Sequence, residues 1–233
     1  MTALPATLLT RGPHRPDAAP GLAIAGDLRL AAGRVHELCG ISRRMLALAI
    51  AARATGPVLW IAPGHVTVQP NPCGFAPWLD PARLLHVRAD HDRDLLWVME
   101  ESLRSGAAPT VIADLPGPPG LTAVRRLHLA AETGSKDGAV APLGLLMTPE
   151  GGAPGVETRW QMTPDFDGDG AGWRLDRQRA RTAPPRSDRL GAATLLGHAP
   201  LRTDRPQAPA HSASRAASRA RIIRDNSQEI IPR

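Results

Sequence analysis

The turn at residues 39–45 holds the side chains of this sequence that are best suited to chemistry. Its sequence is Cys-Gly-Ile-Ser-Arg-Arg-Met, and it joins a short strand-like segment to an amphipathic segment that begins at Ser42. Gly40, the Ser42 hydroxyl and a helix N-terminus favour anion binding, because the first turn of a helix leaves backbone N–H groups unpaired. Arg43 and Arg44 add two cations that could contact a phosphate. The alternative is an ordinary strand-to-helix turn with solvated arginines.

Asp114 is the second candidate, because it follows four residues, Thr110–Ala113, that read as a buried strand. An aspartate in this position orients Mg²⁺ in nucleotide hydrolases, whose phosphate loop reads GxxxxGK[ST]. No Gly-Lys-Ser/Thr follows Gly40, so the cation that would stabilise the transferred phosphoryl group is missing. We therefore expect a degenerate nucleotide pocket with no catalytic residue and no resident cofactor. The pocket would comprise Gly40, Ser42, Arg43, Arg44 and Asp114. Weak nucleotide binding and a residual ATPase that uses an arginine remain alternatives.

Strand-like and helix-like segments alternate around these residues. Strands are expected at 35–39, 57–62, 84–87, 109–113 and 143–147, and helices at 42–54, 92–105 and 122–133, with a short turn of helix at 79–84. Such alternation predicts an α/β fold in three layers, in which helices cover both faces of a mostly parallel sheet. The segments 156–162 and 173–179 predict an antiparallel hairpin at one edge of that sheet.

Composition divides the 233 residues into three parts. We expect a flexible arm at 1–20, one α/β domain at 21–182, and a basic, largely disordered tail at 183–233. Residues 174–233 hold 13 of the 28 Lys and Arg residues and 5 of the 22 Asp and Glu residues, a net charge of +8 against −2 for the rest. This placement favours contact with nucleic acid or with an acidic partner.

Two groups of residues are candidates for that contact. The first is a set of arginines along the last expected strand, of which the last three lie at spacing two and would share one face: Arg174, Arg177, Arg179 and Arg181. They form either a solvated edge or a surface for nucleic acid or a partner. The second is a set of paired isoleucines in the polar tail: Ile222, Ile223, Ile230 and Ile231. They form either a docking motif that orders on binding or part of a plainly disordered tail.

Other patterns exclude several classes of protein. No apolar run approaches the roughly 20 residues of a membrane span, and Met1–Thr10 lacks the features of a signal peptide, so a cytoplasmic protein is expected. Cys39 and Cys73 have no metal-ligand spacing. Residues 165–176 match the spacing of a calcium loop, but a strand rather than a helix precedes them, so we interpret them as a hairpin turn without metal.

Several segments together resemble ImuA, a bacterial relative of RecA. The resemblance rests on residues 34–40, the strands at 57–61 and 110–114, and the segments 77–85, 94–106 and 125–132, and it extends over roughly residues 22–181. It implies a RecA-like core and a role in damage-induced (SOS) translesion synthesis and mutagenesis. The implied partners are an ImuB-type protein and, as further candidates, RecA, an error-prone C-family polymerase and weakly held DNA. ImuA proteins have also been related to SulA, which gives an alternative function as an inhibitor of cell division.

The same resemblance implies that the ATPase chemistry of RecA is lost. Residues 61–65 offer no counterpart of its catalytic glutamate, and Thr148 stands at the position of its sensor glutamine. The segments that match its two DNA-binding loops, 115–120 and 148–155, contain no Arg or Lys. Strong DNA binding of the RecA type is therefore not expected.

Overall fold

The computed structural model describes residues 21–26, 28–66, 69–167 and 170–196. In chain order, the elements of this part are β1 (Gly21–Ala25), β2 (Leu28–Ala31), β3 (Val35–Cys39), α1 (Arg43–Arg53), β4 (Val58–Pro63), α2 (Pro72–Phe75), the 3-10 turn η2 (Pro81–Arg83), β5 (Leu84–Ala89), α3 (Asp92–Ser105), β6 (Thr110–Asp114), α4 (Leu121–Asp137), β7 (Leu143–Met147), β8 (Thr158–Asp167), β9 (Gly170–Ala180), β10 (Arg186–Gly191) and α5 (Ala192–Leu195).

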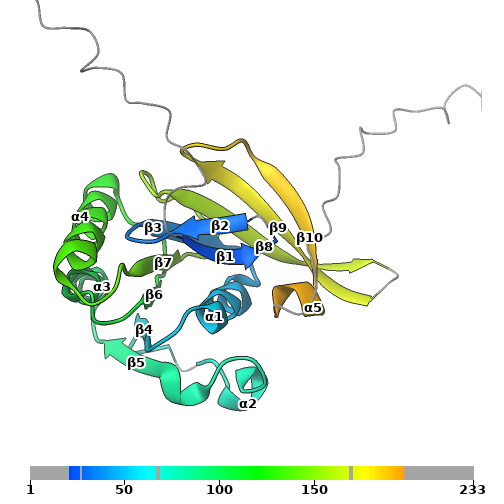
Figure 1. Ribbon diagram of the computed structural model, residues 1–233, viewed down its shortest axis with the longest axis horizontal. Coiled ribbons are helices and arrows are strands. Elements are labelled where there is room, and N and C mark those ends of the chain that lie inside the picture. Colours follow the sequence, from blue (N-terminus) through cyan, green and yellow to red (C-terminus); the bar gives the residue numbers. More distant parts are fainter. Residues whose placement is uncertain (1–20, 27, 67–68, 168–169, 197–233) are drawn as a thin grey trace, which may run out of the picture. The chain divides into compact units, whose positions relative to one another are not determined.

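Eight of these strands form one mixed sheet in the order β10-β9-β8-β3-β7-β6-β4-β5. The six strands from β8 to β5 in that order run parallel to their neighbours, whereas β9 pairs antiparallel with both β8 and β10. Helices flank the sheet on both faces (Figure 1). The predicted α/β architecture, with a parallel core and an antiparallel edge, is confirmed.

The two faces of the sheet bury two separate apolar cores. On one face α1 and the β1–β2 ribbon pack over β3, β7 and β8, with Leu46, Ile50 and Trp160 fully buried. On the other face α3 and α4 lie side by side and bury Leu95, Met99 and Leu103 against the parallel strands (Figure 1). The helix expected at 92–105 is α3, and its apolar residues at helical spacing face this core.

Arginine side chains hold the end of α1. The last carbonyl groups of a helix lack intrahelical donors, and they need other partners when they are not solvated. Arg83 donates to the carbonyl oxygens of Ala51, Ala54 and Gly56, which fixes the turn before β4. Arg53 donates to the carbonyl oxygens of Thr194 and Leu195 and so attaches α5 to α1.

The folded part continues past residue 182, where the composition of the sequence predicts the start of a largely disordered tail. Residues 186–191 form β10 and residues 192–195 form α5. Leu190 and Leu195 are fully buried, and these isolated leucines provide no periodic pattern that a sequence would reveal. The arm at 1–20 and the tail from 197 onward lie outside the described residues. Among the helices of the described ranges, none combines the length and the apolar character of a membrane span.

Candidate functional site

Arg44 and Asp114 form an ion pair at the carboxyl edge of the parallel sheet, where ligands of α/β proteins usually bind. Asp114 ends β6, and Arg44 is the second residue of α1. Arg44 places Nε 2.8 Å and Nη2 2.7 Å from Asp114 Oδ2. Arg43 Nε lies 4.0 Å from Oδ1 of the same carboxylate, whose side chain is only 7% exposed. The predicted pocket residues therefore meet, but their charges are directed at one another.

Three backbone donors of the turn are also occupied. Gly40 N–H donates to the carbonyl oxygen of Pro149, Ser42 N–H to that of Met162 and Arg43 N–H to that of Gly40, at 3.0–3.2 Å. An anion at a helix N-terminus depends on such N–H groups being unpaired. Ser42 lies at the N-cap position of α1, but its side chain makes no capping hydrogen bond.

Gly40 serves the packing of this turn. Its φ is +87°, a conformation that side chains with a Cβ rarely adopt. A Cβ at this position would lie 2.6 Å from the Met162 carbonyl oxygen of β8. Glycine is thus required because the turn passes close to the neighbouring strand.

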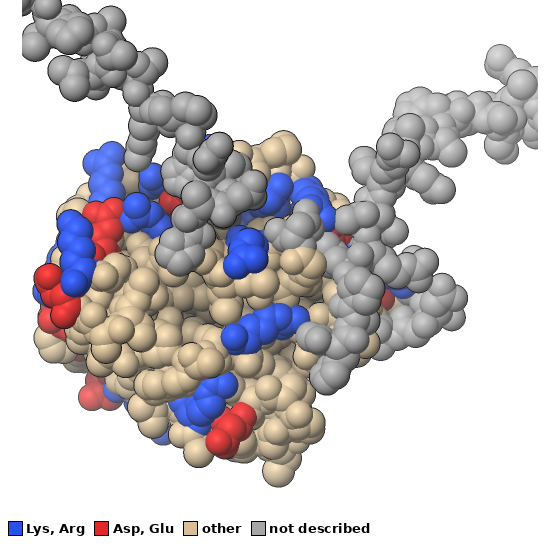
Figure 2. Space-filling view, in the orientation of Figure 1, with Lys and Arg blue, Asp and Glu red and all other residues tan. Residues whose placement is uncertain are grey.

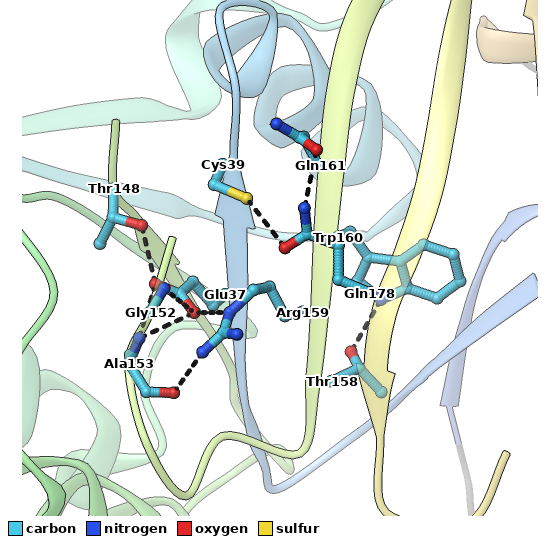
Figure 3. A network of polar contacts seen from close by, with 10 residues as sticks. All are labelled: Glu37, Cys39, Thr148, Gly152, Ala153, Thr158, Arg159, Trp160, Gln161 and Gln178. Atoms are coloured by element: carbon cyan, nitrogen blue, oxygen red, sulfur yellow. Dashed lines mark hydrogen bonds and ion pairs between the residues drawn. The ribbon is translucent and has the colours of Figure 1, made fainter. Parts of the chain in front are cut away.

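Glu37 is a site residue that sequence reasoning missed. It is fully buried in β3, and its carboxylate accepts hydrogen bonds from Thr148 Oγ1 at 2.7 Å and from Ala153 N–H at 3.1 Å (Figure 3). Arg159 of β8 supplies the compensating charge, and it also donates to the Ala153 carbonyl oxygen. A glutamate within a short strand expected to be buried is the signal that could have revealed this network, since a buried charge needs a partner.

The Glu37 network fixes the segment after β7. This segment, residues 148–155, is the one that the resemblance to ImuA leads us to expect at the position of a DNA-binding loop of RecA. Here Thr148 N–H donates to the Leu38 carbonyl oxygen, and Gly152 N–H lies 3.3 Å from Glu37 Oε2. The segment is therefore attached to the sheet at several points. Beside it, Gln178 contacts both Cys39 and Gln161 (Figure 3).

The arginines of β9 do not share one face, contrary to our expectation. A β-bulge shifts the register, so that Arg177 pairs with Trp160 while Arg179 pairs with Arg159. Neighbouring residues of a strand point to opposite faces, so Arg177 and Arg179 do as well. The guanidinium carbon of Arg177 lies 5.6 Å from the centre of the Trp160 ring.

Two other arginines of that set are engaged in ion pairs. Arg174 Nη2 lies 3.6 Å from Asp165 Oδ2, and Arg181 Nε lies 3.5 Å from Glu157 Oε2. Both contacts are partly exposed, so each contributes modestly to stability. Whether this edge contacts nucleic acid or a partner stays a prediction.

The remaining sequence predictions concern metals and the tail. The strands β8 and β9 pair through Asp167 and Gly170, which agrees with a hairpin at the calcium-like segment. Within the described ranges no cluster of His, Cys, Asp or Glu could hold a metal ion. Ile222, Ile223, Ile230 and Ile231 lie outside the described residues.

The fold and this site define an α/β protein with Arg–Asp contacts at the carboxyl edge of its parallel sheet. The sequence is ImuA-like, as its motifs predicted. Protein ImuA of Caulobacter vibrioides strain NA1000 / CB15N is 30% identical over 166 residues, which span 64% of this chain and 65% of that protein. ImuA of strain ATCC 19089 aligns with the same identity and coverage. The match thus covers slightly less than two thirds of the length of these relatives. No family model matches the chain.

Among solved structures, SulA from Pseudomonas aeruginosa aligns with 50% of this chain and 98% of its own, at 20% identity and a TM-score of 0.38. A similarity of this size carries no argument about function. The SulA-like alternative therefore stays an untested prediction.

Proposed function

We propose that this chain is a non-catalytic accessory protein of damage-induced mutagenesis, acting in translesion DNA synthesis through protein contacts. The similarity to ImuA supports the role. One observation carries the non-catalytic part: the Asp114 carboxylate, which would orient Mg²⁺, is bound by Arg44 and faces Arg43. Opening this edge for a nucleotide would leave two guanidinium groups without their carboxylate.

The proposed partner is an ImuB-type protein, with RecA and an error-prone C-family polymerase as further members of the assembly. The net charge of residues 174–233 supports contact with an acidic surface or with DNA. Arg174 and Arg179 are exposed, whereas Arg177 is partly buried over Trp160, so the first two are the better contact residues.

A pull-down tests this proposal. The full-length chain and a chain truncated at Thr203 are each incubated with an ImuB-type protein, and with RecA in a parallel series. We expect the full-length chain to retain the ImuB-type protein, and the comparison with the truncated chain locates the contact. Binding by neither form to the ImuB-type protein would overturn the proposal.

A matched pair of variants addresses the surface. The double variant Arg174→Ala, Arg179→Ala removes two charges from β9, and Arg93→Ala, Arg125→Ala removes two exposed charges from α3 and α4. We expect weaker retention of the partner by the first double variant alone.

A further inference from the structure

A hollow lies at the amino end of β3, on the side of the sheet opposite to the carboxyl edge that holds Arg44 and Asp114. It has a volume of about 500 Å³, within the range of roughly 300–1,000 Å³ that is typical of small-molecule sites. Its walls are the loop between β2 and β3, the last turns of α4, the start of β8 and the end of β9. None of the carboxyl-edge residues described above lines it.

Cations outnumber anions around this hollow. Four basic residues line it, Arg29, Arg34, Lys136 and Arg177, against two acidic residues, Glu132 and Glu157, so the formal net charge of the lining is +2. Lys136 is the single lysine of the chain. In the view of Figure 2, Lys and Arg side chains gather along the upper part of the described surface, over the region of α4 and the β1–β2 ribbon in Figure 1.

Both carboxylates of the lining already have a cationic partner. Glu132 pairs with Arg34, and Glu157 pairs with Arg181, which does not itself line the hollow. Within the described ranges, Arg29 and Lys136 form no ion pair with a carboxylate. Arg29 donates one hydrogen bond, to the Gly21 carbonyl oxygen at 2.8 Å, although a guanidinium carries five N–H donors. The lining therefore has capacity to bind an anion.

The walls are fixed before any ligand arrives. Gly33 has a φ of +66°, and a Cβ there would lie 2.6 Å from Ser135 Oγ, so glycine lets the β2–β3 loop lie against α4. The Gly33 N–H donates to the Pro142 carbonyl oxygen at 2.9 Å, and the ion pair between Arg34 and Glu132 attaches the same loop to the helix. A site whose groups are held in place loses less entropy on binding.

The floor of the hollow is polar and neutral. His36 lies 3.0 Å through Nε2 from the Ala31 carbonyl oxygen and 2.7 Å through Nδ1 from Thr158 Oγ1. Because a carbonyl only accepts, Nε2 carries the proton. The Thr158 hydroxyl accepts from Trp160 Nε1–H and donates to His36 Nδ1. Recognition of a charged ligand therefore belongs to the arginines and the lysine of the walls.

We propose that this hollow binds a small anion that carries phosphate groups, up to the size of a nucleotide. A phosphate monoester carries a charge of about −1.5 to −2 at pH 7, which the formal +2 of the lining complements. Arginine forks and a lysine point charge are the side chains that bind phosphate most strongly. This inference does not depend on the proposed accessory role, because it concerns a different edge of the sheet.

Calorimetric titration of the full-length chain tests the proposal. The salt concentration is about 0.15 M, because this ionic strength screens exposed charges beyond roughly 8 Å. The probes are sodium pyrophosphate and ATP. We expect saturable binding of pyrophosphate. Comparison of its affinity with that of ATP shows whether the hollow prefers an inorganic phosphate or a nucleotide. The double variant Arg29→Ala, Lys136→Ala should bind at least about tenfold more weakly, since charge-assisted contacts are lost. The control double variant Arg93→Ala, Arg125→Ala should bind within about twofold of the parent, because those charges lie elsewhere.

Three results would overturn the proposal. The first is that neither pyrophosphate nor ATP gives any heat of binding. The second is equal weakening by both double variants, which indicates a general effect of charge. The third is binding that Arg44→Ala abolishes and the hollow's double variant leaves unchanged, which places the ligand at the carboxyl edge. If the double variant does not fold, Lys136→Gln alone is expected to weaken binding, and unaltered binding by it contradicts the proposal.

Discussion

Arg44 Nη2 lies 2.7 Å from Asp114 Oδ2, across the edge of the sheet where an α/β protein normally receives its ligand. The contact joins the start of α1 to the end of β6, residues 70 positions apart in sequence. In the sequence, Arg44 suggests phosphate binding and Asp114 suggests magnesium binding, but in the structure the two side chains bind each other. This ion pair is therefore the structural basis of our proposal that the protein does not catalyse nucleotide hydrolysis.

This pair predicts a measurable coupling. Asp114→Ala should lower the free energy of unfolding by about 1–3 kcal/mol, because it leaves two partly buried guanidinium groups without their carboxylate. Arg44→Ala should cost less, and the double variant should cost less than the sum of the two. A double-mutant cycle from urea unfolding measures the coupling. Additive single effects would mean that the ion pair contributes nothing.

Gly40 should tolerate no side chain. Gly40→Ala forces a Cβ toward the Met162 carbonyl oxygen in a left-handed conformation, and we expect a loss of about 1–3 kcal/mol. Gly117→Ala is the matched control, because nothing lies within 4 Å of a Cβ at that position. Urea unfolding of both variants tests the prediction, and a loss of equal size in each would contradict it.

Glu37 should be essential for the segment that follows β7. Glu37→Ala removes a carboxylate with four partners and leaves Arg159, 17% exposed, without its counter-charge. We expect destabilisation of about 3–5 kcal/mol, and a smaller loss for Glu37→Gln, which keeps an acceptor. Hydrogen exchange at the Ala153 amide should accelerate in both variants. An unchanged exchange rate at the Ala153 amide would show that Glu37 does not hold the segment after β7 in place.

Stability should fall as the pH is lowered from about 6.5 to about 4. Burial lowers the pKa of His36 to about 4, so in this range the unfolded chain binds a proton that the folded chain does not. The stability that neutral His36 allows is thus complete above pH 6.5 and is lost as the pH falls toward its folded pKa, by up to ~3 kcal/mol. His36→Gln should flatten the profile. Burial lowers the pKa of His128 as well, so some dependence should persist.

The two cysteines should react differently with iodoacetamide. Cys73 is exposed, whereas burial first, and the nearby Glu37 carboxylate second, raise the pKa of the Cys39 thiol to about 11. Because the thiolate is the reactive form, labelling at pH 8 should modify Cys73 alone until urea unfolds the chain. Peptide mass spectrometry measures the two sites. Equal labelling of the folded protein would contradict this arrangement.

The sequence predicted regular elements well where one pattern determines them. Helix α3 begins and ends at the predicted residues, because Leu95, Met99 and Leu103 repeat at helical spacing and Gly106 adopts a left-handed φ of 58°. The meeting of Gly40, Arg44 and Asp114 was also predictable, since the carboxyl ends of parallel strands lie at one edge.

Other features depend on contacts that no local pattern records. Glu37 and Thr148 are 111 positions apart, and only the pairing of β3 with β7 brings them together. The bulge at β9 inserts one residue into a polar stretch, so spacing alone placed Arg177 and Arg179 on the wrong relative faces. The hollow beside His36 is assembled from five separate segments and has no motif of its own.

Hydrolysis of ATP in the presence of Mg²⁺ tests the central claim most directly. The full-length chain and its Asp114→Ala variant are compared for phosphate release against buffer alone. We expect no turnover above buffer for either protein, because Arg44 occupies the carboxylate that would orient the metal. Turnover by the full-length chain that Asp114→Ala abolishes would contradict it.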